Sequence, residues 1–214
     1  MSLADLRREY TSGGLRRADL DANPIKQFQK WFAQAEIALA KNQLDVNAGT
    51  LATADKNGIP SARVVLLKGL AERGFTFFTN YDSRKGRELA ENPNAALVFY
   101  WHELERQVCI AGSMKKTSRE ESENYFKSRP RGSQLAAWAS DQSKTISDRA
   151  ALETNWQELE KKFATDIPLP PNWGGFILKP ERIEFWQGRP SRLHDRFSYT
   201  RRPDNSWKLE RLAP

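Results

Sequence analysis

Residues 50–115 contain a series of short segments rich in β-branched and aromatic residues, and this feature limits the possible folds more than any other. Such segments predict β-strands. The Asn57-Gly58 pair after the first segment predicts a tight hairpin, because a type I′ turn needs positive φ at both central positions. Consecutive strands joined by short turns indicate an antiparallel meander that tends to close into a barrel. The strands expected here are Thr50–Ala54, Ser61–Lys68, Phe75–Thr79, Ala95–Trp101 and Arg106–Lys115.

Helices are expected on both sides of this stretch and once inside it. Pro24 suits the first turn of a helix, where its missing N–H costs nothing, and apolar residues at helical spacing extend that helix to about Ala40. Ser118 and Glu121 have the spacing of a capping box, in which each residue bonds the other's backbone N–H. The other elements expected are helices at Arg84–Glu91, from Ser118 to Ser128, at Gln134–Ala139 and from a Ser147 cap to Phe163, and strands at Gly175–Lys179, Arg182–Trp186, Arg196–Thr200 and Trp207–Arg211.

Residues 1–23 are polar and contain Gly13-Gly14, so we expect a flexible N-terminal arm with a short helix at Leu3–Tyr10. The remaining residues, 24–214, have a length that fits one domain. We therefore predict a mainly β structure with flanking helices, an α+β domain built on a β-barrel.

The charge balance favours small anionic ligands. Lys and Arg number 34 against 27 acidic residues, a formal net charge of +7, but no long basic run occurs, which argues for discrete anion pockets rather than a nucleic-acid tail. Cys109 is the single cysteine, and His102 and His194 are the two histidines, so neither a disulfide nor a His-rich metal site is expected. No phosphate-binding glycine loop is present, so side chains must hold any anion. Without an apolar leader or a membrane-length apolar run, we expect a soluble, cytoplasmic chain.

The segment Ile183–Arg196 has the highest density of residues suited to chemistry. If it is extended, the two-residue strand period puts Arg192, His194 and Arg196 on one face, close to Trp186. Two guanidinium groups beside an imidazole suit a phosphate or an electron-rich ring. On spacing alone, a surface salt-bridge ladder remains the alternative.

This segment closely resembles the signature of the pyridoxine/pyridoxamine 5′-phosphate oxidases, a family of flavin mononucleotide (FMN) enzymes, and the similarity covers nearly the whole chain from Leu6. It implies an FMN-binding split β-barrel that works as a homodimer, with FMN at the subunit interface. The motifs that carry it are Arg63–Lys68, Phe78-Thr79-Asn80 with Ser83-Arg84-Lys85, Trp101-His102 with Glu105–Val108, Tyr125–Gln134, Arg192–Arg196 and Arg211–Pro214.

The resemblance also implies a set of site residues, carried over by motif position. Contacts to FMN would come from Arg63, Val64, Val65, Leu66, Leu67, Lys68, Phe78, Thr79, Arg84, Lys85, Gln107, Gln142, Ser143, Trp186 and Arg196. Contacts to substrate would come from Lys68, Tyr125, Arg129, Ser133, Arg192, Leu193 and His194, with Arg7, Arg8, Glu9 and Tyr10 as lid residues.

The reaction implied is oxidation of pyridoxine 5′-phosphate or pyridoxamine 5′-phosphate to pyridoxal 5′-phosphate. Hydride passes from C4′ to the flavin, O2 reoxidises the flavin to give H2O2, and the amine substrate also releases NH3. Arg192 and His194 would be the catalytic residues, Arg192 by polarising substrate and His194 by orienting it, because positioning alone supplies much of such a rate. Whether His194 also transfers protons stays open, and no metal is expected.

Three other functions remain to be distinguished. A split-barrel flavin reductase would not need the substrate set that includes Tyr125, Arg129 and Arg192. A carrier would bind FMN or pyridoxal phosphate without turnover. A nucleic-acid binder would show salt-dependent affinity for generic DNA or RNA, and we expect neither nucleic-acid nor membrane binding.

Overall fold

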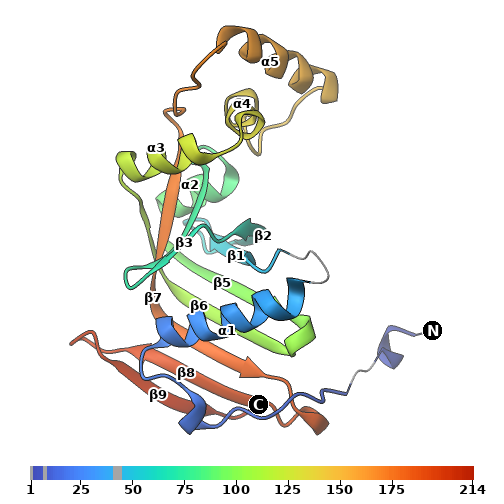
Figure 1. The fold of residues 1–214 in the computed structure, drawn as a ribbon, viewed down its shortest axis with the longest axis vertical. Helices are drawn as coiled ribbons and strands as arrows, with labels where there is room; N and C mark the ends of the chain where they lie inside the picture. The colour runs from blue at the N-terminus through green and yellow to red at the C-terminus, as the bar shows by residue number, and fades with distance from the viewer. Residues whose placement is uncertain (1, 7–8, 41–44) are drawn as a thin grey trace.

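The computed structural model describes residues 2–6, 9–40 and 45–214, and the strands within these ranges form one antiparallel sheet (Figure 1). The strands are β1 (Ala48–Ala54), β2 (Pro60–Leu66), β3 (Gly69–Ala71), β4 (Gly74–Asn80), β5 (Asn94–Trp101), β6 (Arg106–Lys116), β7 (Trp173–Gln187), β8 (Asp195–Arg201) and β9 (Trp207–Leu212). The α-helices are α1 (Pro24–Leu39), α2 (Arg84–Glu91), α3 (Arg119–Ser128), α4 (Arg131–Ala139) and α5 (Arg149–Lys162).

The sheet curls into an incomplete barrel. Its strand order is β2-β1-β5-β6-β7-β4-β3, and β8 and β9 extend it beyond β7. The two ends of this order approach each other, because β2 contacts β4 and the Lys68 N–H donates to the Thr76 carbonyl at 2.8 Å, yet no ladder joins β2 to β4 in the described ranges. The predicted antiparallel meander is confirmed, and the barrel is split rather than closed.

Strand β7 extends from the level of α3 to β8 (Figure 1) and differs from the prediction of two separate strands. Its first part pairs with β4 and its last part with β8, while β6 follows both. Pro180, which lies between the two predicted strands, lacks an N–H for the ladder. The structure accommodates it where the β6–β7 register shifts between Ala111 and Gly112, an irregularity of the kind that tolerates proline.

Aromatic side chains form the centre of the barrel, with α1 laid against them. Asn23 caps α1 by accepting from the N–H groups of Ile25 and Lys26. The buried Phe28 ring then meets Phe75 at 5.0 Å and Phe99 at 5.2 Å between centroids. Because a fully buried aromatic side chain contributes a few kcal/mol, this contact fixes α1 on the sheet.

Local details differ from the predicted ones at two helix starts. Asp148, not Ser147, caps α5, because its carboxylate reaches the Ala151 N–H at 2.8 Å. Ser118 caps α3 as expected, but the Glu121 carboxylate pairs with Arg73 instead of completing the capping box. Helix α4 begins three residues before the predicted Gln134, directly after Pro130.

The predicted β1–β2 turn is also different. Only Gly58 has positive φ, at 80°, whereas a type I′ turn requires it at Asn57 as well. The Gly58 N–H donates to the Asp55 carbonyl, and the Asp55 N–H to that of Ile59, so the hairpin has a longer loop with its one positive φ at the glycine.

From Tyr10 onward the N-terminal segment lies against the C-terminal part of the sheet, whereas Leu3 and Leu6 are exposed, at 87% and 64%. The helix expected at Leu3–Tyr10 is limited to a 3-10 turn at Leu3–Asp5. The N–H groups of Thr11 and Ser12 both donate to the Glu105 carboxylate at 2.9 Å, and the Leu15 N–H donates to Asp195 at 3.0 Å. These bonds attach the first part of the chain next to the end of β7.

Candidate active site

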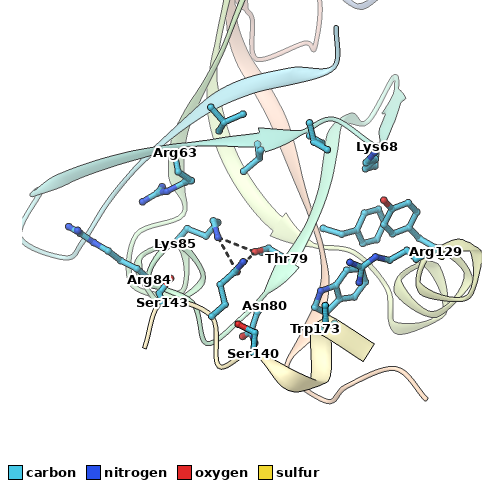
Figure 2. Close-up of a pocket in the computed structure, with 18 of the residues that line it drawn as sticks. Arg63, Lys68, Thr79, Asn80, Arg84, Lys85, Arg129, Ser140, Ser143 and Trp173 are labelled. Atoms are coloured by element: carbon cyan, nitrogen blue, oxygen red, sulfur yellow. Dashed lines mark hydrogen bonds between the residues drawn. The ribbon is translucent and has the colours of Figure 1, made fainter. Parts of the chain in front are cut away.

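A cavity of about 810 Å³ lies between the edge of the barrel and helices α2, α3 and α4 (Figure 2). Its walls combine apolar, hydroxyl and cationic side chains, which suits a ligand with a flat ring and an anionic group. The lining residues are Ser61, Ala62, Arg63, Val64, Val65, Leu66, Lys68, Phe78, Thr79, Asn80, Arg84, Lys85, Tyr125, Arg129, Ala136, Ala137, Ser140, Gln142, Ser143 and Trp173.

Three of the cations lie together on one side of the cavity. Arg63 comes from β2, and Arg84 and Lys85 come from the first turn of α2 (Figure 2). The Lys85 ammonium donates to Thr79 Oγ1 at 3.2 Å and to Gln142 Oε1 at 3.1 Å. Burial lowers the pKa of Lys85, the positive charge of Arg63 lowers it further, and Glu88 opposes both. An anion placed here would relieve this repulsion.

The opposite side of the cavity combines an aromatic stack with Arg129. The Phe78 and Tyr125 rings stack at 3.9 Å, and Tyr125 is nearly parallel to Trp173, at 7°. The Arg129 guanidinium lies 4.8 Å from the centroid of Trp173. Its Nη1 is buried and has no hydrogen-bond partner among the described residues. A buried donor without a partner marks a position where a bound acceptor is expected.

A second cluster occupies the other end of β7. The Trp186 and His194 ring centroids are 4.7 Å apart, and the Tyr10 ring meets both edge-on at 5.5 and 5.4 Å. The Arg189 N–H donates to His194 Nδ1 at 3.1 Å, so this nitrogen carries no proton and Nε2 is the one left for a ligand. Burial, with the charges of Arg192 and Arg196, lowers the pKa of His194 and favours the neutral ring.

Arg196 and Arg192 differ in how firmly they are held. Arg196 donates from Nε to Glu184 at 2.8 Å and from Nη1 to the Ala213 carbonyl at 2.9 Å. Arg192 is exposed and follows Ser191 in a turn where both residues have positive φ, 61° and 54° respectively. Such backbone costs roughly 1–3 kcal/mol per residue and is found most often at functional sites. Because the strand starts only at Asp195, the predicted alternation of Arg192 and His194 along an extended strand is wrong.

The two sets of residues lie far apart in one chain. Trp173 in the cavity and Trp186 in the cluster belong to the same strand, and thirteen residues at ~3.3 Å per residue correspond to roughly 43 Å along it. Their joint action on one ligand therefore requires a second copy of the chain.

The structure divides the sequence-predicted residues accordingly. The cavity contains Arg63, Val64, Val65, Leu66, Lys68, Phe78, Thr79, Arg84, Lys85, Tyr125, Arg129, Gln142 and Ser143. Tyr10, Gln107, Trp186, Arg192, His194 and Arg196 lie at the far end of β7, where Gln107 and Arg196 flank Trp186 in the strand register.

Four described residues of the predicted set stand outside both groups. Leu67 is buried in the core, and Ser133 lies in the first turn of α4 without lining the cavity. Leu193 and Glu9 are exposed, Leu193 at 71%. Arg7 and Arg8 lie outside the described residues.

Sequence reasoning missed Trp173, Asn80 and Ser140 in the cavity wall, and Glu88 behind it. Trp173 offered a signal, since it follows a proline-rich loop at the start of a strand. Glu88 offered another, because it stands four residues after Arg84 on one helix face.

The split sheet and its cationic cavity define the class of protein. A solved structure from Nostoc punctiforme, described as a pyridoxamine 5′-phosphate oxidase-related, FMN-binding protein, superposes with a TM-score of 0.70 at 19% identity, covering 87% of this chain and 97% of its own. The fold is therefore the split barrel of such proteins, as predicted.

Sequence comparison then defines the family. The family model for pyridoxamine 5′-phosphate oxidase matches residues 36–163, and that for the pyridoxine 5′-phosphate oxidase C-terminal dimerisation region matches residues 173–214. Pyridoxine/pyridoxamine 5′-phosphate oxidases of Paraburkholderia phytofirmans and Ralstonia nicotianae are 57% and 56% identical, over 100% of this chain and 99% of theirs. The chain belongs to the pyridoxine/pyridoxamine 5′-phosphate oxidase family and is an oxidoreductase.

A more distant relative has a solved structure with a ligand. PhzG from Burkholderia lata, in complex with tetrahydrophenazine-1-carboxylic acid, is 33% identical with a TM-score of 0.87, covering 95% of this chain and 99% of its own.

Among the helices of the described residues, none is long and apolar enough to span a bilayer.

Proposed function

We propose that this protein binds FMN and oxidises pyridoxine 5′-phosphate and pyridoxamine 5′-phosphate to pyridoxal 5′-phosphate. The observation that carries the proposal is the presence of two separate cationic groups on opposite sides of one cavity (Figure 2). Arg63, Arg84 and Lys85 form one group, and Lys68 and Arg129 form the other. Two groups suit two phosphorylated ligands, a cofactor and a substrate.

The residues present fit FMN. The phosphate would bind Arg84 and Lys85, and the apolar β2 residues Val64 and Leu66 offer a surface for a flat ring. When bound, FMN supplies the chemistry that the side chains lack: it accepts a hydride from the substrate C4′ carbon, and O2 takes the electrons to give H2O2.

The chain's own residues would bind and orient the substrate. Lys68 and Arg129 neutralise its phosphate, with the unpartnered Nη1 of Arg129 as a donor, and Tyr125 adds a hydroxyl. Ser133 does not line the cavity and is not included in this group. Arg192 polarises the substrate ring, and neutral His194 offers its Nε2 N–H for orientation. Holding the reacting carbon in place in this way accounts for a large part of the rate.

We infer a homodimer because the cavity and the cluster around Trp186 and His194 lie far apart in one chain. In the register of the sheet, one outward-facing row runs from Val64 in the cavity wall through Val98 and Cys109 to Glu184, the partner of Arg196. Apolar side chains on or near this row are exposed, among them Val64 at 65%. Two copies packed through this face about a two-fold axis would form two equal sites, each combining one chain's cavity with the other's Trp186, Arg192 and His194.

The relationship to PhzG supports a second candidate, an oxidase of the same fold acting on an aromatic carboxylate. The far higher identity to the pyridoxine/pyridoxamine 5′-phosphate oxidases favours the first proposal. A flavin reductase or a carrier without turnover would bind the same cofactor, but neither would convert pyridoxamine 5′-phosphate to pyridoxal 5′-phosphate.

The experiment is a spectrum of the purified protein followed by addition of pyridoxamine 5′-phosphate in air. A flavin absorption with formation of pyridoxal 5′-phosphate and H2O2 supports both cofactor and reaction. A flavin spectrum without turnover moves the function to a flavin reductase, a carrier or an oxidase of aromatic carboxylates. A colourless protein that takes up no added FMN would overturn the proposed site.

A further inference from the structure

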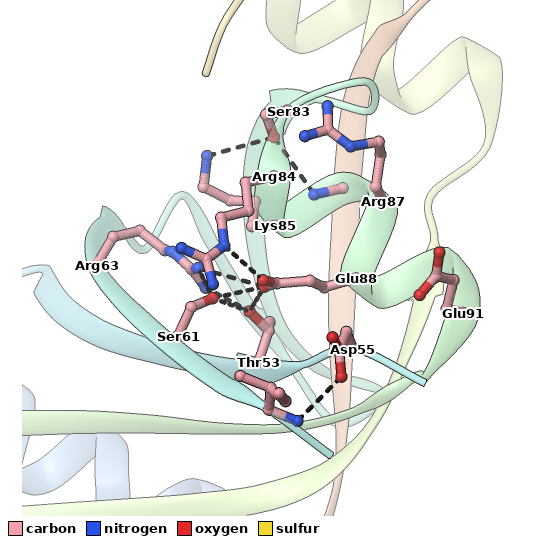
Figure 3. Close-up of polar contacts among 12 residues, drawn as sticks. Thr53, Asp55, Ser61, Arg63, Ser83, Arg84, Lys85, Arg87, Glu88 and Glu91 are labelled. Atoms are coloured by element: carbon pink, nitrogen blue, oxygen red, sulfur yellow. Dashed lines mark hydrogen bonds and ion pairs between the residues drawn. The ribbon is translucent and has the colours of Figure 1, made fainter. Parts of the chain in front are cut away.

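A buried carboxylate lies directly behind the cationic side of the cavity (Figure 3). Glu88 is 6% exposed and belongs to α2, although it does not line the cavity itself. Its Oε2 accepts from Thr53 Oγ1 at 2.5 Å and from Ser61 Oγ at 2.6 Å. Three elements, β1, β2 and α2, therefore meet at one carboxylate.

The same carboxylate joins two arginines of the cavity wall. Oε1 accepts from Arg84 Nε at 2.8 Å, and Oε2 lies 3.4 Å from Arg63 Nη2. Arg63 also donates to the Thr53 and Ser61 hydroxyls that bind Glu88 (Figure 3). Oε1 of Glu88 thus binds Arg84, which lines the cavity. Oε2 binds the two hydroxyl groups that also accept hydrogen bonds from Arg63.

Glu88 keeps its charge despite its burial. Desolvation by burial would raise the pKa of the carboxyl group, but hydrogen bonds from Ser61, Thr53 and Arg84 and the charge of Arg63 outweigh it and lower the pKa to about 2. A full negative charge therefore stands between two guanidinium groups at neutral pH, and reduces their mutual repulsion and that of Lys85.

The contacts also determine which parts of Arg84 remain available. Its Nε is bound to Glu88, while neither terminal nitrogen donates a hydrogen bond within the described ranges. The side chain of Arg84 is 59% exposed, so without Glu88 it would have many rotamers. A side chain ordered beforehand loses less conformational entropy when it binds an anion.

We propose that Glu88 is a positioning residue of the flavin phosphate site: it orients Arg63 and Arg84 and so makes the site selective for the phosphorylated flavin over riboflavin. The proposal rests on the proposed FMN function and assigns to the cofactor site a residue that does not touch the cofactor. A purely structural Glu88, which only ties α2 to β1 and β2, predicts something different. Its loss would weaken both flavins alike.

The test compares Glu88→Gln with Glu91→Gln, a matched change on the same helix. Glu91 is exposed, and the one hydrogen bond that its side chain makes in the described part of the chain comes from the Lys56 N–H at 3.3 Å. Flavin-free protein is titrated with FMN and with riboflavin, and the dissociation constants are read from flavin fluorescence. Because one charge-assisted contact is lost, FMN should bind Glu88→Gln about tenfold more weakly. The affinity for riboflavin should change by less than about twofold, because riboflavin has no phosphate whose contacts could be lost.

The outcomes separate the two proposals. Wild-type protein that does not prefer FMN to riboflavin would overturn the proposed cofactor function itself. Wild-type preference that persists in Glu88→Gln, or an equal loss of both flavins, would overturn the role of Glu88. Glu91→Gln should behave as wild type. If Glu88→Gln fails to fold, Thr53→Val replaces it, because this change removes one hydrogen-bond donor to Glu88. The preference for FMN over riboflavin, measured as the ratio of their dissociation constants, should then fall by a smaller factor. An unchanged ratio would count against the proposal.

Discussion

The cavity and the Trp186–His194 cluster differ in how completely a single chain builds them. In the cavity, Lys85 and Arg63 are hydrogen-bonded by neighbours from several elements, and Glu88 stands behind them. In the cluster, Arg192 is exposed on a turn with two positive φ values, and Leu193 next to it is 71% exposed. The cations of the cavity are held by contacts within one chain, whereas Arg192 and Leu193 beside the cluster are exposed to solvent.

This difference indicates a division of roles. A phosphate site benefits from cations fixed in advance, because ordering them on binding costs free energy. Residues that act on the substrate ring need to reach a ligand held elsewhere, and here that ligand would lie on the cavity of a second copy. The region 173–214, matched by a dimerisation-region family, contains β7, β8 and most of the cluster.

Arg192→Ala is the variant with the largest expected effect, and it tests the division of roles between the cavity and the cluster. Because Arg192 belongs to the cluster and not to the cavity, turnover should fall by about 10²-fold or more, while FMN content stays that of wild type. The measurements are kcat with pyridoxamine 5′-phosphate and the flavin-to-protein ratio. Arg202→Ala, at an exposed position in the β8–β9 turn, is the control. Equal loss of turnover and flavin would remove Arg192 from its proposed role.

The next effect concerns the substrate side of the cavity. Arg129→Ala removes a buried guanidinium nitrogen, Nη1, that has no partner in the described ranges, so KM for the phosphorylated substrate should rise. A lost charge-assisted contact of about 1.5–3 kcal/mol corresponds to roughly 10- to 150-fold. Arg131→Ala is the control, since its guanidinium is exposed and donates to the carbonyls of Phe163 and Thr165. An unchanged KM in Arg129→Ala would exclude Arg129 from the phosphate site.

A mixed dimer joins the two regions in one experiment. Arg129→Ala is defective in the cavity and Arg192→Ala in the cluster, so a dimer of one of each contains one site with both defects and one with neither. After unfolding and refolding together, random pairing should restore about a quarter of wild-type activity at low substrate concentration. Each variant refolded alone provides the baseline. If activity does not exceed that baseline, both halves of a site belong to one chain.

The sequence predicts more of the fold than of the site, for identifiable reasons. The start of α1 is predictable because Asn23 and Pro24 are local signals, and the predicted hairpin β1–β2 is present although its turn type differs. Strand β7 is predicted as two strands separated at Pro180, because the bulge that tolerates this proline depends on β6. Strand alternation could not reveal that Arg192 lies in a turn.

Contacts between distant segments explain what was missed at the site. Trp173 belongs to the cavity wall because Phe78 and Tyr125, from β4 and α3, stack parallel to it. Glu88 acquires its role from Thr53 and Ser61, two residues on separate strands. Motif resemblance supplied most of the cavity's residues, but it pointed to ligand contacts and not to the carboxylate behind them.

The smallest expected effect is a change in titration within the cluster. Burial lowers the pKa of His194, and the positive charges of Arg192 and Arg196 lower it further from 6.5. Removing one cation in Arg192→Ala reduces the repulsion that imidazolium would feel, so the pKa of His194 should rise. Imidazole NMR signals followed between about pH 5 and 8 would measure it, and His102, the one other histidine in the sequence, supplies a reference signal. Arg202→Ala, the control in the β8–β9 turn, should leave the pKa of His194 unchanged, because Arg192 and Arg196 are the charges that act on this ring in the described part of the chain. An equal change in both variants would contradict the assignment of Arg192 to the neighbourhood of His194.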